Sequence, residues 1–300
     1  MTTKGSALKV KSQDWFLFLT VGVLWGIPYL FISIAVNELS PTIVIITRST
    51  IGALILGALT IAQKTFFTEI RNWKLIFIYA IGELIGPWFF ITHAQEKLSS
   101  GLTSLLLCTT PIWATVFASI YGDKTVWEGK RIVGLGVGFT GIIFLVGLET
   151  FSNIGNGYAI GEVLLASIGY AWAVNMIIKK LPNADLLAIN AVALAITSLV
   201  YLPIALLNLP TEMPSTKAIT SLIVLGVFCT GGGFISFFLV VRKMGAARAS
   251  LVTYINVMVA ILLGIIVLSE PITLGILIGL PLVLVGSYLA SRKHESAVIQ

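Results

Sequence analysis

Ten apolar segments, separated by short polar gaps, constrain the fold of this chain more than any other feature. A helix needs about 20 apolar residues to cross a hydrocarbon core of roughly 30 Å. Backbone groups in that core must bond within their own helix, because no water is present there. The predicted fold is therefore an all-α integral membrane protein with ten transmembrane helices. We place them at residues 15–36, 42–62, 75–95, 98–120, 131–148, 158–178, 186–208, 218–240, 247–269 and 272–291.

The polar remainder of the chain is too small for a separate soluble domain. Only 11% of the residues are charged, whereas soluble domains carry about 25%. Residues 1–14 are polar and basic, and no small-residue cleavage site follows the first span, so we expect an uncleaved cytoplasmic tail. Cys108 and Cys229 lie inside apolar segments and are expected to be buried small hydrophobes, not a disulfide.

Lysine and arginine residues are distributed unequally between the two sets of gaps. Cytoplasmic gaps of membrane proteins carry an excess of these residues. One set, which includes both termini, contains sixteen of them, and the other contains only Lys97 and Lys217. Both termini are therefore expected in the cytoplasm, beneath an inner (plasma) membrane, and the net charge of +6 requires no nucleic-acid partner. The sixteen are Lys4, Lys9, Lys11, Lys64, Arg71, Lys74, Lys124, Lys130, Arg131, Lys179, Lys180, Arg242, Lys243, Arg248, Arg292 and Lys293.

The two halves of the sequence resemble each other at an offset of about 146 residues. Residues 97–105 align with 243–251, and Trp25 aligns with Trp172. Five spans are an odd number, so the second copy enters the membrane inverted, and inverted repeats are a common transporter architecture. Repeats also occur in proteins that only span or assemble, which is the alternative. The predicted organisation is a tail at 1–14, repeats at 15–148 and 158–291, and a tail at 292–300.

Short motifs in both halves resemble those of a known family. They are Leu24-Trp25-Gly26, Arg48, Leu98-Ser99-Ser100, Thr110-Pro111-Ile112, Gly245-Ala246-Ala247-Arg248-Ala249-Ser250 and Leu268-Ser269-Glu270-Pro271-Ile272-Thr273. Over residues 15–291 the chain resembles the EamA family of the drug/metabolite transporter superfamily. The resemblance implies ten helices, alternating access, and export of amino acids, metabolites or toxic compounds. In the first copy Asp123 stands where the family usually has glutamate.

Three ionisable residues lie inside predicted spans, where each costs at least about 2.5 kcal/mol on insertion scales. Glu83 is near mid-depth of the third span, and we hypothesise that it faces a central cavity and binds a proton or a cationic amine. The alternative is a structural pair between Glu83 and Arg48 of the second span. Glu162 is one turn inside the sixth span and is expected at the interface.

Aromatic and small polar residues inside the spans are further candidates for the site. Amphipathic rings suit an organic substrate with one polar end. The alternatives are lipid-facing rings and hydrogen bonds between helices. Tyr170 is one more ring inside a span. The candidates for substrate binding are Trp25, Tyr29, Trp88, Thr110, Trp113, Trp172, Asn175, Tyr254 and Asn256.

The middle of the third and eighth spans carries helix-breaking residues at corresponding positions. Pro87 follows Glu83, and Gly231, Gly232 and Gly233 follow its counterpart Thr230. Glycine and proline weaken a helix, so we predict a paired hinge; close packing of the glycines is the alternative. The pairs Gly134/Gly138 and Gly275/Gly279 are predicted to be helix contacts.

Other functional classes lack their usual residues in this sequence. It contains two histidines and no HExxH motif, Cys/His cluster or P-loop. We therefore predict no enzymatic activity and no cofactor or metal. The expected partners are a small-molecule substrate and the lipid bilayer, with a second copy of the chain as a further option. A membrane-embedded enzyme and a non-transporting receptor or assembly subunit remain the alternatives.

Overall fold

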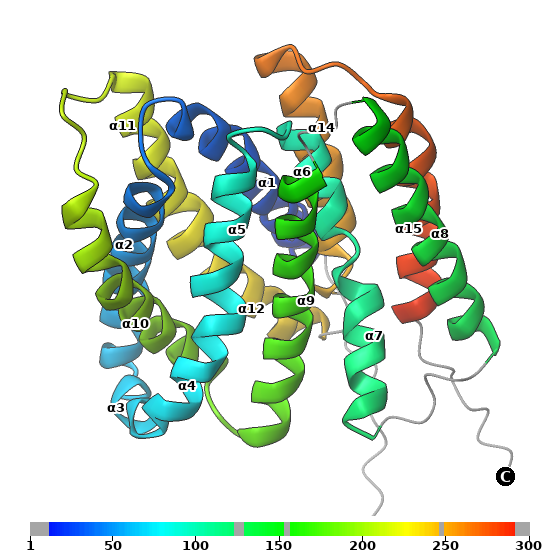
Figure 1. Cartoon of the computed structure of the whole chain (residues 1–300). Helices are drawn as coiled ribbons and strands as arrows, with labels where there is room; N and C mark the ends of the chain where they lie inside the picture. Colours follow the sequence, from blue (N-terminus) through cyan, green and yellow to red (C-terminus); the bar gives the residue numbers. More distant parts are fainter. Residues whose placement is uncertain (1–11, 123–128, 153–156, 246–248, 292–300) are drawn as a thin grey trace, which may run out of the picture.

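The computed structural model describes residues 12–122, 129–152, 157–245 and 249–291, and these residues contain helices and no strand (Figure 1). Seven apolar helical spans are long enough to cross a bilayer, and three shorter apolar helices accompany them within the described residues. The predicted all-helical membrane fold is therefore confirmed. The single-helix spans are α1 (Ser12–Val36), α2 (Pro41–Ala62), α8 (Gly129–Ser152), α9 (Gly157–Lys180), α10 (Leu186–Leu207), α14 (Val252–Leu268) and α15 (Leu274–Ser291).

The remaining three spans are composed of several consecutive helices. The third contains α3 (Phe66–Glu69), η1 (Ile70–Asn72), α4 (Trp73–Ala80), η2 (Ile81–Ile85) and α5 (Gly86–Ala94). The fourth contains α6 (Ser100–Leu107) and α7 (Thr110–Ile120). The span predicted at residues 98–120 is therefore present but consists of two helices. The eighth contains α11 (Thr216–Ile223), η5 (Val224–Gly232) and α12 (Gly233–Met244).

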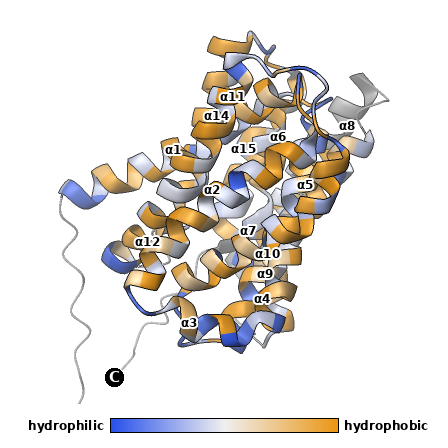
Figure 2. Cartoon of the chain, turned by 90° about the vertical axis from the view of Figure 1, so that its left-hand side faces the viewer, coloured by the Kyte–Doolittle hydropathy of each residue, from blue (hydrophilic) through white to orange (hydrophobic). Residues whose placement is uncertain are grey.

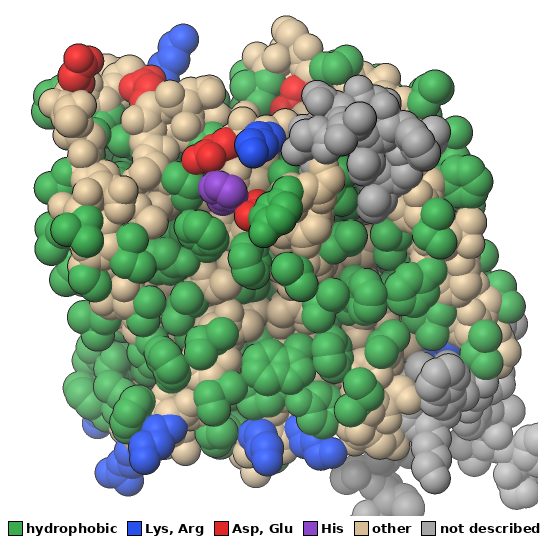
Figure 3. All heavy atoms as spheres, viewed as in Figure 1, with side chains coloured by type: hydrophobic (Ala, Val, Ile, Leu, Met, Phe, Trp, Pro, Cys, Tyr) green, Lys and Arg blue, Asp and Glu red, His purple; other side chains and the backbone are tan. Residues whose placement is uncertain are grey.

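The outer surface of the bundle is apolar around its middle. In Figure 3 hydrophobic side chains cover the centre of the visible face, and charged side chains lie towards its two ends. Figure 2 shows the same pattern from the side. Leu54, Leu199 and Ile266 are 69%, 69% and 74% exposed, which suits contact with lipid rather than water.

The two halves pack on each other with reciprocal contacts. The α2–α10 and α8–α15 pairs each join the same span of the two copies. The first span of one copy packs on the third and fourth spans of the other, because α1 contacts α12 and α14 while α9 contacts α5, α6 and α7. In Figure 1 the α1–α2 connection lies at the top and the α9–α10 connection at the bottom, so α1 and α9 run in opposite directions. The two copies are therefore inverted.

Polar contacts at the helix ends repeat this symmetry. Glu38 accepts hydrogen bonds from the Ser215 N–H (2.7 Å) and hydroxyl (2.6 Å). Glu69 accepts one from the Asp185 N–H at 3.1 Å. The offset that relates Trp25 to Trp172 takes Glu38 to Asp185 and Glu69 to Thr216, the neighbour of Ser215. The same contact between the two copies thus occurs twice. In the Glu38–Ser215 contact the first span-to-span loop of copy one supplies the carboxylate, and in the Glu69–Asp185 contact the equivalent loop of copy two supplies the N–H group. The Ser215 hydrogen bonds also hold the pKa of Glu38 below its ordinary value.

The third and eighth spans each contain a π-helical segment at matching positions. Glu83 lies in η2, and its counterpart Thr230 lies in η5, where its hydroxyl donates to the Leu225 carbonyl five residues earlier (2.8 Å). The predicted irregularity of both spans is therefore confirmed. Such π-turns are rare and occur frequently at functional sites.

Two of the three glycines around η5 are closely packed, as the alternative explanation required. A Cβ on Gly231 would lie 2.7 Å from Ile55 Cδ1, and a Cβ on Gly233 would lie 2.6 Å from Trp25 Nε1. At Gly232 the nearest atom is the Val227 carbonyl oxygen at 3.5 Å, which is ordinary contact. Gly232 is thus the one glycine of the three whose presence packing does not explain.

The fifth spans of the two copies cross at glycines. In α8 and α15 a Cβ on Gly286 would overlap the backbone of Gly138, and a Cβ on Gly141 would lie 2.8 Å from Val283 N. The predicted contact role of Gly138 is therefore observed, and its partner in α15 is Gly286. Small residues permit such close approach of helix backbones in a membrane.

Candidate functional site

The Arg48 side chain lies inside the bundle against an aromatic ring. Its residue is 8% exposed, and Cζ lies 3.6 Å from the centroid of the Trp88 ring. The buried Nε has no hydrogen-bond partner in the described structure. The ion pairs among the described side chains do not include one between Arg48 and Glu83. The predicted alternative, a structural Arg48–Glu83 pair, is therefore not what the structure contains.

Glu83 is positioned by the π-helical turn of the third span. The residue is partly exposed, yet its Oε2 atom is buried and has no hydrogen-bond partner among the described residues. The Trp172 ring packs beside it, since a Cβ on Gly82 would lie 2.8 Å from that ring. The carboxylate is within electrostatic range of the Tyr79 and Tyr170 hydroxyls. Glu83 thus combines an unpaired oxygen with a partly accessible position.

Tyr170 of α9 lies near both Arg48 and Glu83. The Tyr170 hydroxyl lies near Trp88 and within electrostatic range of Arg48, Glu83 and Tyr29. Tyr29 of α1 is buried and also interacts with Arg48. We name Tyr29, Arg48, Glu83, Trp88 and Tyr170 the charged aromatic cluster. Its residues come from α1, α2, the third span and α9, so both copies contribute to it.

Thr110 and Asn175 form hydrogen bonds between helices. The Thr110 hydroxyl lies 3.0 Å from the Ser167 hydroxyl and donates to the Leu107 carbonyl at 2.7 Å. The Asn175 amide donates to the Ala171 carbonyl at 2.8 Å and to the Ala114 carbonyl at 3.5 Å. These contacts are the helix-to-helix alternative that the sequence left open.

Tyr254 and Asn256 lie on α14, which packs on α1. Tyr254 packs against the core that contains Tyr29. Asn256 is partly exposed, and a Cβ on Gly26 would lie 2.7 Å from its carbonyl oxygen. The role of both residues in binding stays a prediction.

The tryptophans predicted to line a cavity are mainly packing residues. Trp25 packs on Phe237 with ring centroids 4.6 Å apart and lies against Gly233 at the end of η5. Its counterpart Trp172 packs on Gly82 of η2. Each copy thus supports the π-helical segment of the other. Trp113 stands edge-on to Phe139 at 5.2 Å, and its buried Nε1 has no partner in the described structure.

Glu162 is paired with a histidine that the sequence did not link to it. His93 Nδ1 lies 2.9 Å from both carboxylate oxygens of Glu162, and the pair joins α5 to α9. Phe89 stacks on the His93 ring at 5.6 Å. Glu162 is only 8% exposed, so the pairing explains how a carboxylate is buried close to the helix end. Sixty-nine residues separate the partners, and no local pattern could reveal them.

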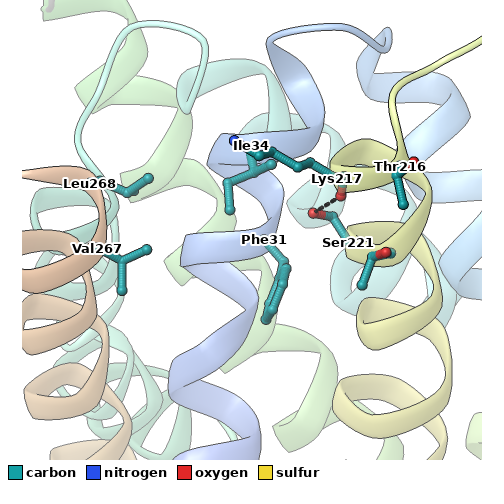
Figure 4. Close-up of a pocket in the computed structure, with 8 residues that line it drawn as sticks. Phe31, Ile34, Thr216, Lys217, Ser221, Val267 and Leu268 are labelled. Atoms are coloured by element: carbon teal, nitrogen blue, oxygen red, sulfur yellow. Dashed lines mark hydrogen bonds between the residues drawn. The ribbon is translucent and has the colours of Figure 1, made fainter.

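A surface pocket of about 430 Å³ lies between α1, α11 and α14 (Figure 4). Phe31 and Val267 supply apolar walls, while Lys217 and Ser221 lie on the α11 side. None of the candidate residues predicted from the sequence lines it, so this pocket is separate from the charged aromatic cluster.

Comparison with known proteins finds matches over nearly the whole chain. The model of the EamA-like transporter family matches twice, at residues 15–147 and 159–292. The uncharacterized transporter YoaV of Bacillus subtilis is 25% identical over 90% of this chain and 94% of its own. An uncharacterized transporter of Archaeoglobus fulgidus is 26% identical over 94% and 100%. The uncharacterized inner membrane transporter YedA of Escherichia coli K12 is 24% identical over 92% of both. One crystal structure superposes with a TM-score of 0.64 at 18% identity, covering 94% of this chain and 98% of its own, which supports the fold alone.

Proposed function

The chain belongs to the EamA-like transporter family, and from that premise we propose that it is a secondary transporter of the inner membrane that exports small metabolites. Membership in this family makes it a multi-span membrane transporter. The proposal adds export, alternating access around the charged aromatic cluster, and a zwitterionic substrate such as an amino acid. Both termini are placed in the cytoplasm because sixteen of the basic residues lie in gaps on their side.

The observation that carries the proposal is the state of Arg48 and Glu83. Opposite charges inside a bilayer normally pair, because each is costly when left alone. These two do not pair, and each has a buried polar atom without a partner in the described structure. A substrate with both a carboxylate and an ammonium group would satisfy both residues. The rings of Tyr29, Trp88 and Tyr170 would then contact its apolar part.

The inverted repeat supports an alternating-access cycle. Two similar halves that exchange conformations close one face of the membrane and open the other around a shared site. The matched π-helical segments η2 and η5 are irregular at corresponding positions of the two halves. We propose that they act as the paired hinge, with Pro87 in the first copy and Gly231, Gly232 and Gly233 in the second.

Glu83 is also the proposed site of proton coupling. A carboxyl group that loses contact with water in one half of a cycle and regains it in the other can take up and release a proton. Glu83 is partly exposed while its Oε2 atom is buried, which fits a position between these two environments.

The test is flux of labelled solutes in proteoliposomes at two pH values. We expect a zwitterionic amino acid to move down its gradient. We expect Glu83→Gln to slow this flux at least about tenfold, since the loss of one charged contact is typically worth this factor. The same substitution should remove the pH dependence of the flux. The matched control is Glu162→Gln, because Glu162 lies in another span and is already paired with His93. An unchanged rate and pH dependence in Glu83→Gln would end the role of Glu83, and product formation in place of flux would indicate an enzyme.

A further inference from the structure

Glu270, in the link between α14 and α15, holds a helix of the other copy. Its carboxylate accepts hydrogen bonds from the Ser100 N–H (2.7 Å), the Ser100 hydroxyl (2.9 Å) and the Gly101 N–H (3.1 Å). Ser100 and Gly101 form the first turn of α6, where backbone N–H groups have no partner within the helix and the helix dipole attracts a negative charge. We call these three hydrogen bonds the Glu270 latch.

The surrounding backbone is shaped to admit this carboxylate. A Cβ on Gly264 would overlap Glu270 Oε2 and lie 2.6 Å from the Ser100 hydroxyl. Ser269 ends α14 in the left-handed conformation with φ of 55°, and the Glu270 N–H donates to the Gly264 carbonyl at 3.0 Å. The chain therefore turns back so that the carboxylate enters the space left open by Gly264.

Glu270 and a local residue share the capping of α6. Ser99 already precedes this helix as its N-cap, and its hydroxyl accepts from the Leu102 N–H at 3.2 Å. A local cap is the usual way to satisfy a helix start. Ser99 satisfies only the Leu102 N–H, and the Glu270 carboxylate of the second copy satisfies the N–H groups of Ser100 and Gly101 at the same helix start.

The other end of α6 is held by the same part of the second copy. The fourth span breaks at Cys108, whose carbonyl accepts a hydrogen bond from the Ser287 hydroxyl of α15 at 2.8 Å. After the break, Thr109 and Thr110 bond to Ser167 of α9 instead. The polar contacts at the two ends of α6 thus go to the α14–α15 link and to α15, whereas those at the start of α7 go to α9.

We infer that Glu270 is a positioning residue of the transport cycle, which locks α6 against α14 and α15 and so closes the path to the charged aromatic cluster from that membrane face. Leu102 and Leu105 of α6, and Cys108 at its end, belong to the same buried core as Tyr29 of the cluster, so release of the latch frees a segment that packs over that residue. The inference rests on the proposed alternating access. The matching residue of the first copy, Asp123, lies outside the described residues.

The test uses Cys108 as a reporter, since Cys229→Ser leaves it as the sole cysteine of the chain. Its reaction with a membrane-impermeant maleimide is measured from each side of proteoliposomes without substrate. We expect Glu270→Gln and Ser100→Ala to raise the labelling rate from the Glu270 side at least about fivefold, because each shifts the population towards the open state. Labelling from the opposite side stays unchanged or falls.

Ser99→Ala is the matched control, because it removes the local cap of α6 without touching Glu270. We expect it to lower the melting temperature and leave Cys108 labelling at the parent rate, which separates a latch from a simple loss of helix stability. If Glu270→Gln and Ser100→Ala label no faster than Ser99→Ala, the latch is wrong; Ser100→Ala alone decides this if Glu270→Gln does not fold. The labelling requires no flux, so a failed transport assay contradicts the proposed function and leaves the latch result standing.

Discussion

A guanidinium group inside a membrane has no water to contact, and that of Arg48 lies against the face of the Trp88 ring instead. The Trp88 ring centroid lies 3.6 Å from the guanidinium carbon of Arg48. A desolvated cation–π contact of this kind is worth about 2 kcal/mol or more. It stabilises the charge but uses none of the five N–H donors of the side chain. Trp88 therefore orients Arg48, whose buried Nε has no hydrogen-bond partner in the described structure.

Arg48→Lys should weaken recognition of a carboxylate selectively. Lysine keeps the charge but lacks the planar fork that binds both carboxylate oxygens and stacks on a ring. We expect the KM for an amino acid to rise at least about tenfold, equivalent to 1.4 kcal/mol, while the KM for the corresponding decarboxylated amine changes little. Flux of both solutes in proteoliposomes measures this. Arg131→Lys, at the start of the fifth span, is the control, and an equal effect on the two solutes would contradict carboxylate recognition.

At the scale of helices, the apolar runs alone determine where the spans lie, because a bilayer accepts little except an apolar helix. Glycine and proline further indicate that the third and eighth spans are irregular. The π-helical register of η2 and η5 could not be predicted, since it depends on rings of the other copy that pack on Gly82 and Gly233. The same holds for the His93–Glu162 pair, which joins distant segments. The break at Cys108 has a local cause instead, because Pro111 lies in the first turn of α7 and cannot continue the hydrogen bonds of α6.

Gly232→Ala is the sharpest test of the hinge in η5. A Cβ there meets only the Val227 carbonyl oxygen at 3.5 Å, so the residue fits, and alanine favours a regular helix by about 1 kcal/mol. We expect the melting temperature to stay the same or rise while the transport rate falls several-fold, because η5 then flexes less. Gly231→Ala is the contrasting variant, since its Cβ would lie 2.7 Å from Ile55 Cδ1 and should reduce stability. A Gly232→Ala protein that transports at the parent rate would rule out a hinge at this position.

The whole molecule is organised by exchange of contacts between two inverted copies. Glu38 binds Ser215 on one face, and Glu69 binds Asp185 on the other. The charged aromatic cluster, the latch and both π-helical segments all contain contacts between residues of different copies. No half can therefore form the site by itself, and a change of orientation between the halves alters all of these contacts together.

Inversion of the copies has a direct consequence for labelling of equivalent positions. With both native cysteines replaced by serine, single cysteines are introduced at four exposed loop positions that form two equivalent pairs, Gln63 with Glu212 and Asn37 with Asn183. The basic residues place Gln63 and Asn183 on the cytoplasmic side. We therefore expect an impermeant maleimide to label Asn37→Cys and Glu212→Cys in intact cells, and Gln63→Cys and Asn183→Cys only after permeabilisation. Two parallel copies would instead label both members of each pair from one side. That result would remove the shared site between opposed halves, and with it the physical basis for alternating access.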